Sequence, residues 1–156
     1  MKNHISKGIY AGFVATIVLS VLMVLKSLLH MLPKMNAIKM LASMAHGYLG
    51  IPMSPTIGWV LHFAIGSLLW GILFAWLYRR LPGQAASIKG ILFGTFAWLI
   101  MMIVVMPMAG AGLFGLHLGL GAPVATLVLH WIYGAVLGVV YGKLISSGLM
   151  TSHTHA

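Results

Sequence analysis

The sequence predicts an all-α membrane protein in which four transmembrane helices form two repeated helical hairpins, plus one interfacial amphipathic helix. Of the 156 residues, 61% are hydrophobic and only 6% are charged, whereas about a quarter are charged in a typical soluble domain. Four long apolar runs are bounded by basic residues or proline, and one motif occurs twice. We therefore expect one membrane domain over residues 1–156, with repeat one at 7–80, repeat two at 89–144 and a polar tail at 145–156.

Each apolar run predicts one span. The run 8–25 lies between Lys7 and Lys26, and at about 1.5 Å rise per residue it is long enough to cross the hydrocarbon core. It is too long for the core of a signal peptide, so we expect it to be retained. Its helix should continue to Leu32 and end before Pro33, because proline interrupts helical hydrogen bonding. The other spans are expected at residues 56–78, 90–106 and 124–142, the third ending before Pro107.

Residues 34–54 are too polar and broken to form a span. Asn36 is placed to cap the start of a helix there, and Gly47 to end it. At helical spacing one face carries Ile38, Leu41, Ala45 and Tyr48, and the other carries Lys39, Ser43 and His46. This pattern predicts an amphipathic helix in the membrane interface. Residues 108–122, apolar and rich in glycine, are expected to form an interfacial loop or a shallow re-entrant segment.

The charge balance excludes several kinds of chemistry. The chain has nine Lys and Arg, no Asp or Glu and no Cys, for a formal net charge of +9. Without acidic side chains it cannot build carboxylate acid–base pairs or carboxylate sites for Mg²⁺ or Ca²⁺, and we predict no catalytic residues. Because the positive charges flank apolar runs, they favour the lipid bilayer as a partner over nucleic acid. A larger membrane complex or a homo-oligomer is a further expected partner.

The positions of the basic residues predict the orientation. The expected spans place six of them on one side and three on the other, and the side with more lysine and arginine usually faces the cytoplasm. Both termini are therefore expected in the cytoplasm. The larger group is Lys2, Lys7, Arg79, Arg80, Lys89 and Lys143, and the smaller is Lys26, Lys34 and Lys39.

The repeated motif reads Pro55-Thr-Ile-Gly-Trp-Val-Leu-His-Phe-Ala-Ile-Gly66 and, 68 positions later, Pro123-Val-Ala-Thr-Leu-Val-Leu-His-Trp-Ile-Tyr-Gly134. A second pair matches Lys7-Gly-Ile-Tyr-Ala-Gly12 with Lys89-Gly-Ile-Leu-Phe-Gly94 at an offset of 82. The difference of 14 corresponds to the interfacial helix, which only the first half contains. Two hairpins of the same orientation would be related by an axis along the membrane normal. Their glycines at four-residue spacing are typical of closely packed membrane helices.

The repeat places one histidine, His62 or His130, on each of two spans. Ionisable side chains inside a membrane are costly and are functional candidates by default. Helical spacing puts His62, Gly66, Leu69 and Leu73 on one stripe, and His130, Gly134, Leu137 and Tyr141 on the equivalent one. If the stripes face each other, the pair could bind a cofactor or metal, such as haem or copper. If not, each imidazole would fix helix packing through a separate partner such as Ser20, Thr16 or Thr95. A polar substrate or a proton path is a third reading.

Methionines gather near the expected outer ends of the spans. Met101, Met102, Met106 and Met108 lie together in the sequence, and others occur in residues 31–53 with His30 and His46. Thioethers and imidazoles suit Cu(I), but methionine is also a flexible filler of apolar cores, which is the reading we favour.

The stretch Gly8-Ile-Tyr-Ala-Gly-Phe-Val-Ala-Thr16 and the Leu-His steps at His62 and His130 resemble small four-span bacterial inner-membrane proteins of a family of unknown function. The resemblance implies that fold and the bacterial inner (plasma) membrane as location, and no activity. The sequence alone favours a non-catalytic integral membrane protein, an accessory or scaffold subunit. The alternatives are a bis-histidine haem or copper protein and a small permeation unit that works as an oligomer.

Overall fold

The structure, a computed structural model, describes residues 2–30 and 35–153. Four of its helical segments are long and apolar enough to cross a membrane: Asn3–Leu28, Pro55–Leu77, Ala86–Met108 and Gly121–Ser147. The helical elements are α1 (Lys2–Leu28), α2 (Ala37–Leu49), α3 (Pro55–Phe63), η1 (Ala64–Leu69), α4 (Trp70–Leu77), α5 (Ala86–Ile100), η2 (Met101–Val105), α6 (Met106–Met108), η3 (Leu113–Leu118) and α7 (Gly121–His153). The predicted all-α fold with four candidate spans is confirmed.

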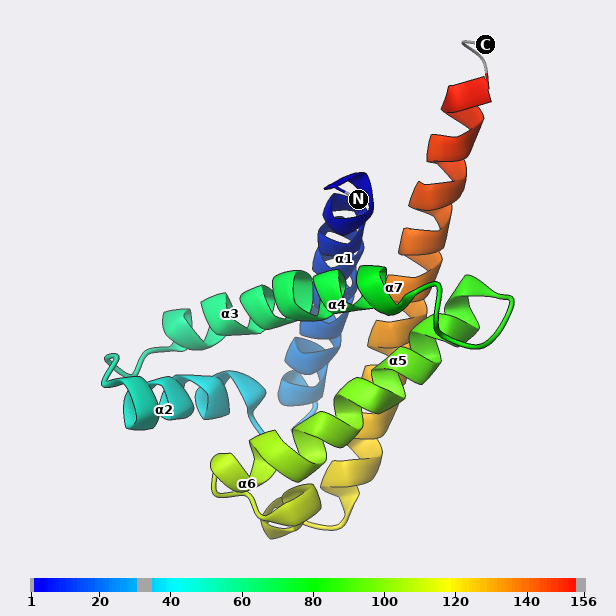
Figure 1. Ribbon diagram of the computed structural model, residues 1–156. Helices are drawn as coiled ribbons and strands as arrows, with labels where there is room; N and C mark the ends of the chain where they lie inside the picture. The colour runs from blue at the N-terminus through cyan, green and yellow to red at the C-terminus, as the bar shows by residue number, and fades with distance from the viewer. Residues whose placement is uncertain (1, 31–34, 154–156) are drawn as a thin grey trace.

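Two spans are continuous helical runs that contain a π-helical turn. The second span consists of α3, η1 and α4, and the third of α5, η2 and α6. Figure 1 shows the first turns of α1 and the last turns of α7 toward the top, and α2 and α6 toward the opposite end.

Several expected boundaries are wrong by a few residues or more. α1 ends at Leu28, because the chain turns at His30, whose φ is +54°; the expected end at Leu32 and Pro33 lies outside the described residues. The third span runs through Pro107 to Met108, where the preceding π-turn alters the backbone hydrogen-bond register that a proline would break. α7 continues far into the expected polar tail, to His153.

The helix expected in the membrane interface is α2, and it packs against α3. Asn36 caps it as predicted, because its side chain accepts a hydrogen bond from the Lys39 amide at 2.9 Å. The expected end at Gly47 is wrong: Gly50 ends the helix in the left-handed conformation (φ +67°), which a residue without Cβ adopts at little cost. The face toward the protein consists of Ile38, Ala42 and Ala45.

Close glycine contacts hold the spans together. A Cβ added at Gly8 or Gly12 of α1 would meet the backbone of Gly71 or Gly66 on the second span. A Cβ added at Gly90 or Gly94 of α5 would meet the backbone of Gly134 or His130 on α7. Because lipid tails are as apolar as the helices, close backbone approach of this kind is a main source of association in a bilayer.

The π-turn η1 rearranges the stripe predicted on the second span. In α3 the spacing is helical, but a π-turn adds one residue to the turn, so that Gly66, Ser67 and Gly71 are buried while Leu69 is 55% exposed. Gly66 and Leu69, which helical spacing places on one stripe with His62, therefore differ in how deeply they are buried. On α7, which stays α-helical, Gly134, Leu137 and Tyr141 are all buried as the spacing predicts.

An aromatic cluster closes the end of the bundle at which α4, α5 and α7 meet. Phe74 lies 5.1 Å from Phe93 and 5.5 Å from Tyr141, measured between ring centroids, and all three are buried. Their edge-on arrangements are the ones that aromatic quadrupoles favour. The cluster fills one end of the bundle.

Candidate functional site

A cavity of about 1110 Å³ lies between α1, α2, the second span, the third span and α7. Both histidines of the repeated motif, His62 and His130, line it. The sequence placed them on two spans but gave no means of showing that they border the same space. The cavity is somewhat larger than the usual range of small-molecule sites, about 300–1,000 Å³.

His62 is held from α1. Its Nε2 lies 3.2 Å from the hydroxyl of Ser20, which itself donates to the backbone oxygen of Thr16 at 2.7 Å. Because the serine proton is used in the shorter bond, the hydroxyl accepts from Nε2–H, and this network assigns the neutral Nε2–H tautomer. Nδ1 of His62 then carries the lone pair. Ser20 is one of the partners that the sequence suggested for this histidine.

His130 is held from its own helix. Its Nδ1 lies 2.8 Å from the backbone oxygen of Thr126, one turn earlier on α7. A carbonyl can only accept, so Nδ1 donates and Nε2 carries the lone pair. The suggested partner Thr95 is instead used by Trp131, whose indole N–H donates to its hydroxyl at 2.9 Å.

A hydrogen bond between Tyr133 and Gly66 fixes the second span against α7. The Tyr133 hydroxyl donates to the Gly66 oxygen at 2.5 Å, and Tyr133 is only 3% exposed. His62 precedes Gly66 by four residues and His130 precedes Tyr133 by three, so each histidine lies about one helical turn from this bond. This hydrogen bond therefore explains why both imidazoles border one cavity.

Thr126 links His130 to the third span. The Trp98 indole N–H lies 3.1 Å from both the Thr126 hydroxyl and the Pro123 oxygen. The Thr126 hydroxyl in turn donates to the Ala122 oxygen at 2.8 Å. This network holds the first turns of α7, and therefore His130, against α5.

Seven methionines line the same cavity, a concentration that the sequence indicated only in part. They come from four helical elements and from the two segments that flank α2: Met23, Met35, Met40, Met44, Met53, Met101 and Met106. Flexible thioether side chains adapt to irregular apolar ligands. In the described residues no group of three or more histidines, cysteines or acidic residues is placed to hold a metal ion, so a metal here would need other donors.

The end of the cavity at α2 is basic. Lys26 of α1 and Lys39 of α2 line it together with His30 and Asn36. The Lys26 ammonium donates to the backbone oxygen of Met35 at 2.5 Å, which ties α1 to the segment before α2. The cavity thus has a cationic end and an apolar interior, with the two histidines and Tyr133 among its lining residues.

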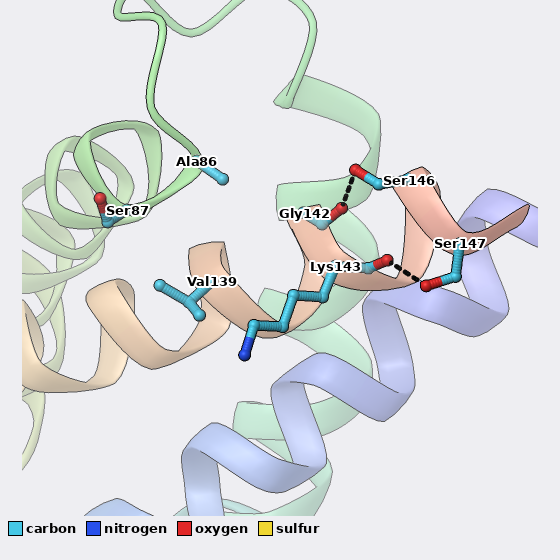
Figure 2. Close-up of a pocket in the computed structure, with 7 residues that line it drawn as sticks. All are labelled: Ala86, Ser87, Val139, Gly142, Lys143, Ser146 and Ser147. Carbon is cyan, nitrogen blue, oxygen red and sulfur yellow. Dashed lines mark hydrogen bonds between the residues drawn. The ribbon is translucent and has the colours of Figure 1, made fainter. Parts of the chain in front are cut away.

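A second hollow, of about 480 Å³, lies between the first turn of α5 and α7 (Figure 2). Its two α7 serines, Ser146 and Ser147, turn back onto their own helix and donate to the oxygens of Gly142 and Lys143, each at 2.9 Å. With those hydroxyl protons used within the helix, the hollow offers little beyond the exposed Lys143, and we assign no site to it.

Sequence reasoning missed Tyr133, Trp98 and Thr126. Tyr133 stands three residues after His130 inside the repeated motif, where the first copy has Ile65, and this difference between the copies is the signal that could have singled it out. The cavity itself has no sequence signal, because its walls come from elements far apart in the chain.

In comparisons with known proteins, the family of unknown function DUF6789 matches residues 2–150. Searches of curated proteins and of solved structures gave no match.

Proposed function

The chain belongs to the DUF6789 family of unknown function, and we propose that it is a non-catalytic integral membrane protein that binds a large, mostly apolar molecule in the cavity. The observation that carries the proposal is the cavity itself, about 1110 Å³ in a chain of 156 residues. An accessory or scaffold role needs closely packed helices, which the glycine contacts provide elsewhere in the fold. Such a role gives no reason for a space of this size.

The charges at the cavity indicate the kind of ligand. Lys26 and Lys39 line one end, in a chain that carries nine basic and no acidic side chains. An anionic group on the ligand would suit this positively charged end, while the methionine-lined interior suits a flexible apolar tail. We therefore assign the ligand to the class of anionic amphiphiles, which includes membrane lipids.

Native mass spectrometry of the protein released from detergent tests the proposal. We expect one bound amphiphile per chain in the wild type. Leu129 lines the cavity, and Leu129→Trp should reduce the bound fraction at least several-fold by filling it. Leu99 is 39% exposed and does not border the cavity, so Leu99→Trp is the matched control and should retain the ligand. A wild-type protein without a bound amphiphile, or equal loss in both variants, would contradict the proposal.

We also propose that the two hairpins are structural repeats. The α1 glycines pack on Gly66 and Gly71 as the α5 glycines pack on Gly134 and Gly138. Gly66 and Gly134 are 68 positions apart but Gly71 and Gly138 are 67 apart. The one-residue difference is what the π-turn in the second span would insert. Of these glycines, Gly71 and Gly138 lie outside the motifs that suggested the repeat.

For location we propose the bacterial inner membrane with both termini in the cytoplasm, which the charge distribution supports. Aromatic and basic side chains meet at the proposed inner end: the Arg80 guanidinium lies 4.8 Å from the Trp76 ring, and the Lys89 ammonium lies 4.8 Å from the Tyr78 ring. Such pairs are typical of the interface between lipid and water.

A further inference from the structure

We infer that His62 and His130 act as electron-pair donors in the cavity, and that the ligand group they contact is an electron-pair acceptor. Such a group is either the O–H or N–H of an organic molecule or a metal centre. The inference rests on the proposed ligand-binding function and deepens it. It follows from which atom accepts the hydrogen bond of each polar proton around the two histidines.

The polar protons next to the histidines are used within the protein. The hydroxyls of Thr16, Ser20, Thr126 and Tyr133 each donate to a backbone oxygen, at 2.5 to 2.8 Å. The N–H groups of the two imidazoles are used as well, His62 toward Ser20 and His130 toward the Thr126 oxygen. Toward a ligand these six side chains can therefore offer only lone pairs, as hydrogen-bond acceptors.

The two lone pairs on ring nitrogens are the strongest of these acceptors. Nδ1 of His62 and Nε2 of His130 have no hydrogen-bond partner among the described residues. They also do not belong to the fully buried atoms without a partner, a group in which Ser67 Oγ is found. Both nitrogens are therefore accessible, and both rings line the cavity. A carbonyl or an ether presented to them would place lone pair against lone pair, which is unfavourable away from water.

The arrangement of His130 is also the one that metal ligation uses. Histidine ligands commonly donate their second N–H to a backbone carbonyl, which fixes the tautomer and the ring. Two axial imidazoles suffice for a haem iron, whereas a bare ion would need further donors, for which the cavity methionines are the candidates. Trp59 and Trp70 also line the cavity, and an indole N–H is a donor, so the inference concerns only the groups facing the histidines.

The test compares two probes that differ in one hydrogen-bond donor: 9,10-dibromooctadecan-1-ol and its methyl ether, in which a methyl group replaces the hydroxyl hydrogen. Bromine quenches tryptophan fluorescence, and Trp59 and Trp70 line the cavity. The exposed Trp76 and Trp131 are replaced by Phe in all samples to lower the background. We expect the alcohol to bind about 2- to 10-fold more tightly than the ether, the factor that one net hydrogen bond provides.

Variants identify the group responsible. In each of the variants His62→Phe and His130→Phe the preference for the alcohol should be halved or abolished. His46 is an exposed histidine on α2 and does not line the cavity, so His46→Phe should leave the preference unchanged. A parallel titration with ferric haem tests the metal arm: a 1:1 complex with the optical spectrum of bis-imidazole ligation, lost in either cavity variant, identifies a metal centre as the acceptor.

Two outcomes would overturn the inference. If alcohol and ether bind equally well and haem forms no complex, the histidines do not select an electron-pair acceptor, although the cavity still binds amphiphiles. If the alcohol is preferred equally in the wild type and in both cavity variants, another group carries the preference. Failure of both probes to quench would instead contradict the proposed ligand-binding function.

Discussion

Tyr133 shows how much a single hydroxyl can determine inside a membrane protein. Its bond to the Gly66 oxygen joins α7 to the π-turn of the second span. A π-turn shifts the register of backbone hydrogen bonds, and no water is available in the hydrocarbon core to compensate a carbonyl left without a partner. The tyrosine therefore stabilises both an irregular turn and the contact that positions the two histidines.

We expect Tyr133→Phe to lower the free energy of unfolding by about 1–2 kcal/mol, the cost of leaving a buried acceptor unpaired. Thermal unfolding in detergent measures the effect. Ser67→Ala is the matched control, because the Ser67 hydroxyl is buried and has no hydrogen-bond partner in the described structure. Its removal should leave stability unchanged or raise it. A Tyr133→Phe protein as stable as the Ser67→Ala protein would show that the bond contributes nothing.

At the scale of the elements, stability depends on pairs of helices that approach at glycine. Gly134 of α7 faces Gly90 of α5 so closely that a Cβ on either would overlap the backbone of the other. Gly47 of α2 is different, because a Cβ there would meet nothing within 4 Å. Both glycines lie within helices, but Gly134 is closely packed and Gly47 has open space beside it.

Gly134→Val should therefore lower the free energy of unfolding by about 3 kcal/mol or more, because the backbones of α5 and α7 must separate. Gly47→Ala should raise it by about 0.5–1 kcal/mol, because alanine loses less backbone entropy in a helix. The fraction that stays monodisperse in size-exclusion chromatography after heating reports both changes. A Gly134→Val protein that stays monodisperse up to the same temperature as the wild type would contradict the close approach of α5 and α7.

For the whole molecule, four candidate spans bring both ends of the chain to the same end of the bundle (Figure 1). Which end faces the cytoplasm depends on the distribution of basic residues, six against three. Because the chain has no cysteine, single introduced thiols report orientation without background.

Ser43 on α2 and Gln84 in the turn before α5 are both exposed and belong to opposite ends of the bundle. In intact cells an impermeant maleimide should label Ser43→Cys, and should label Gln84→Cys only after the membrane is made permeable. Labelling of Gln84→Cys from outside, with Ser43→Cys protected, would reverse the proposed orientation.

The sequence by itself determined the fold class, the N-terminal cap at Asn36 and the glycines at which helices pack. It also indicated four candidate spans and gave the bounds of the second to within a few residues. These are local properties: the length of an apolar run, a side chain that can accept from the first turn, and small residues at helical spacing. The expected boundaries that proved wrong, at Gly47 and at Pro107, were also read from single residues. The helix at Gly47 continues to the cap at Gly50, and the helix at Pro107 continues because a π-turn precedes the proline.

Only the tertiary structure decided that His62 and His130 border one cavity, and it did so through contacts between residues far apart in the chain. Ser20 holds one imidazole from another helix, and the bond from Tyr133 to Gly66 sets the two histidine-bearing helices against each other. The π-turn that makes this register possible leaves no periodic signal in the sequence, since it inserts one residue into an unbroken apolar run. A cavity is space that packing leaves unfilled, and so no single segment of the sequence encodes it.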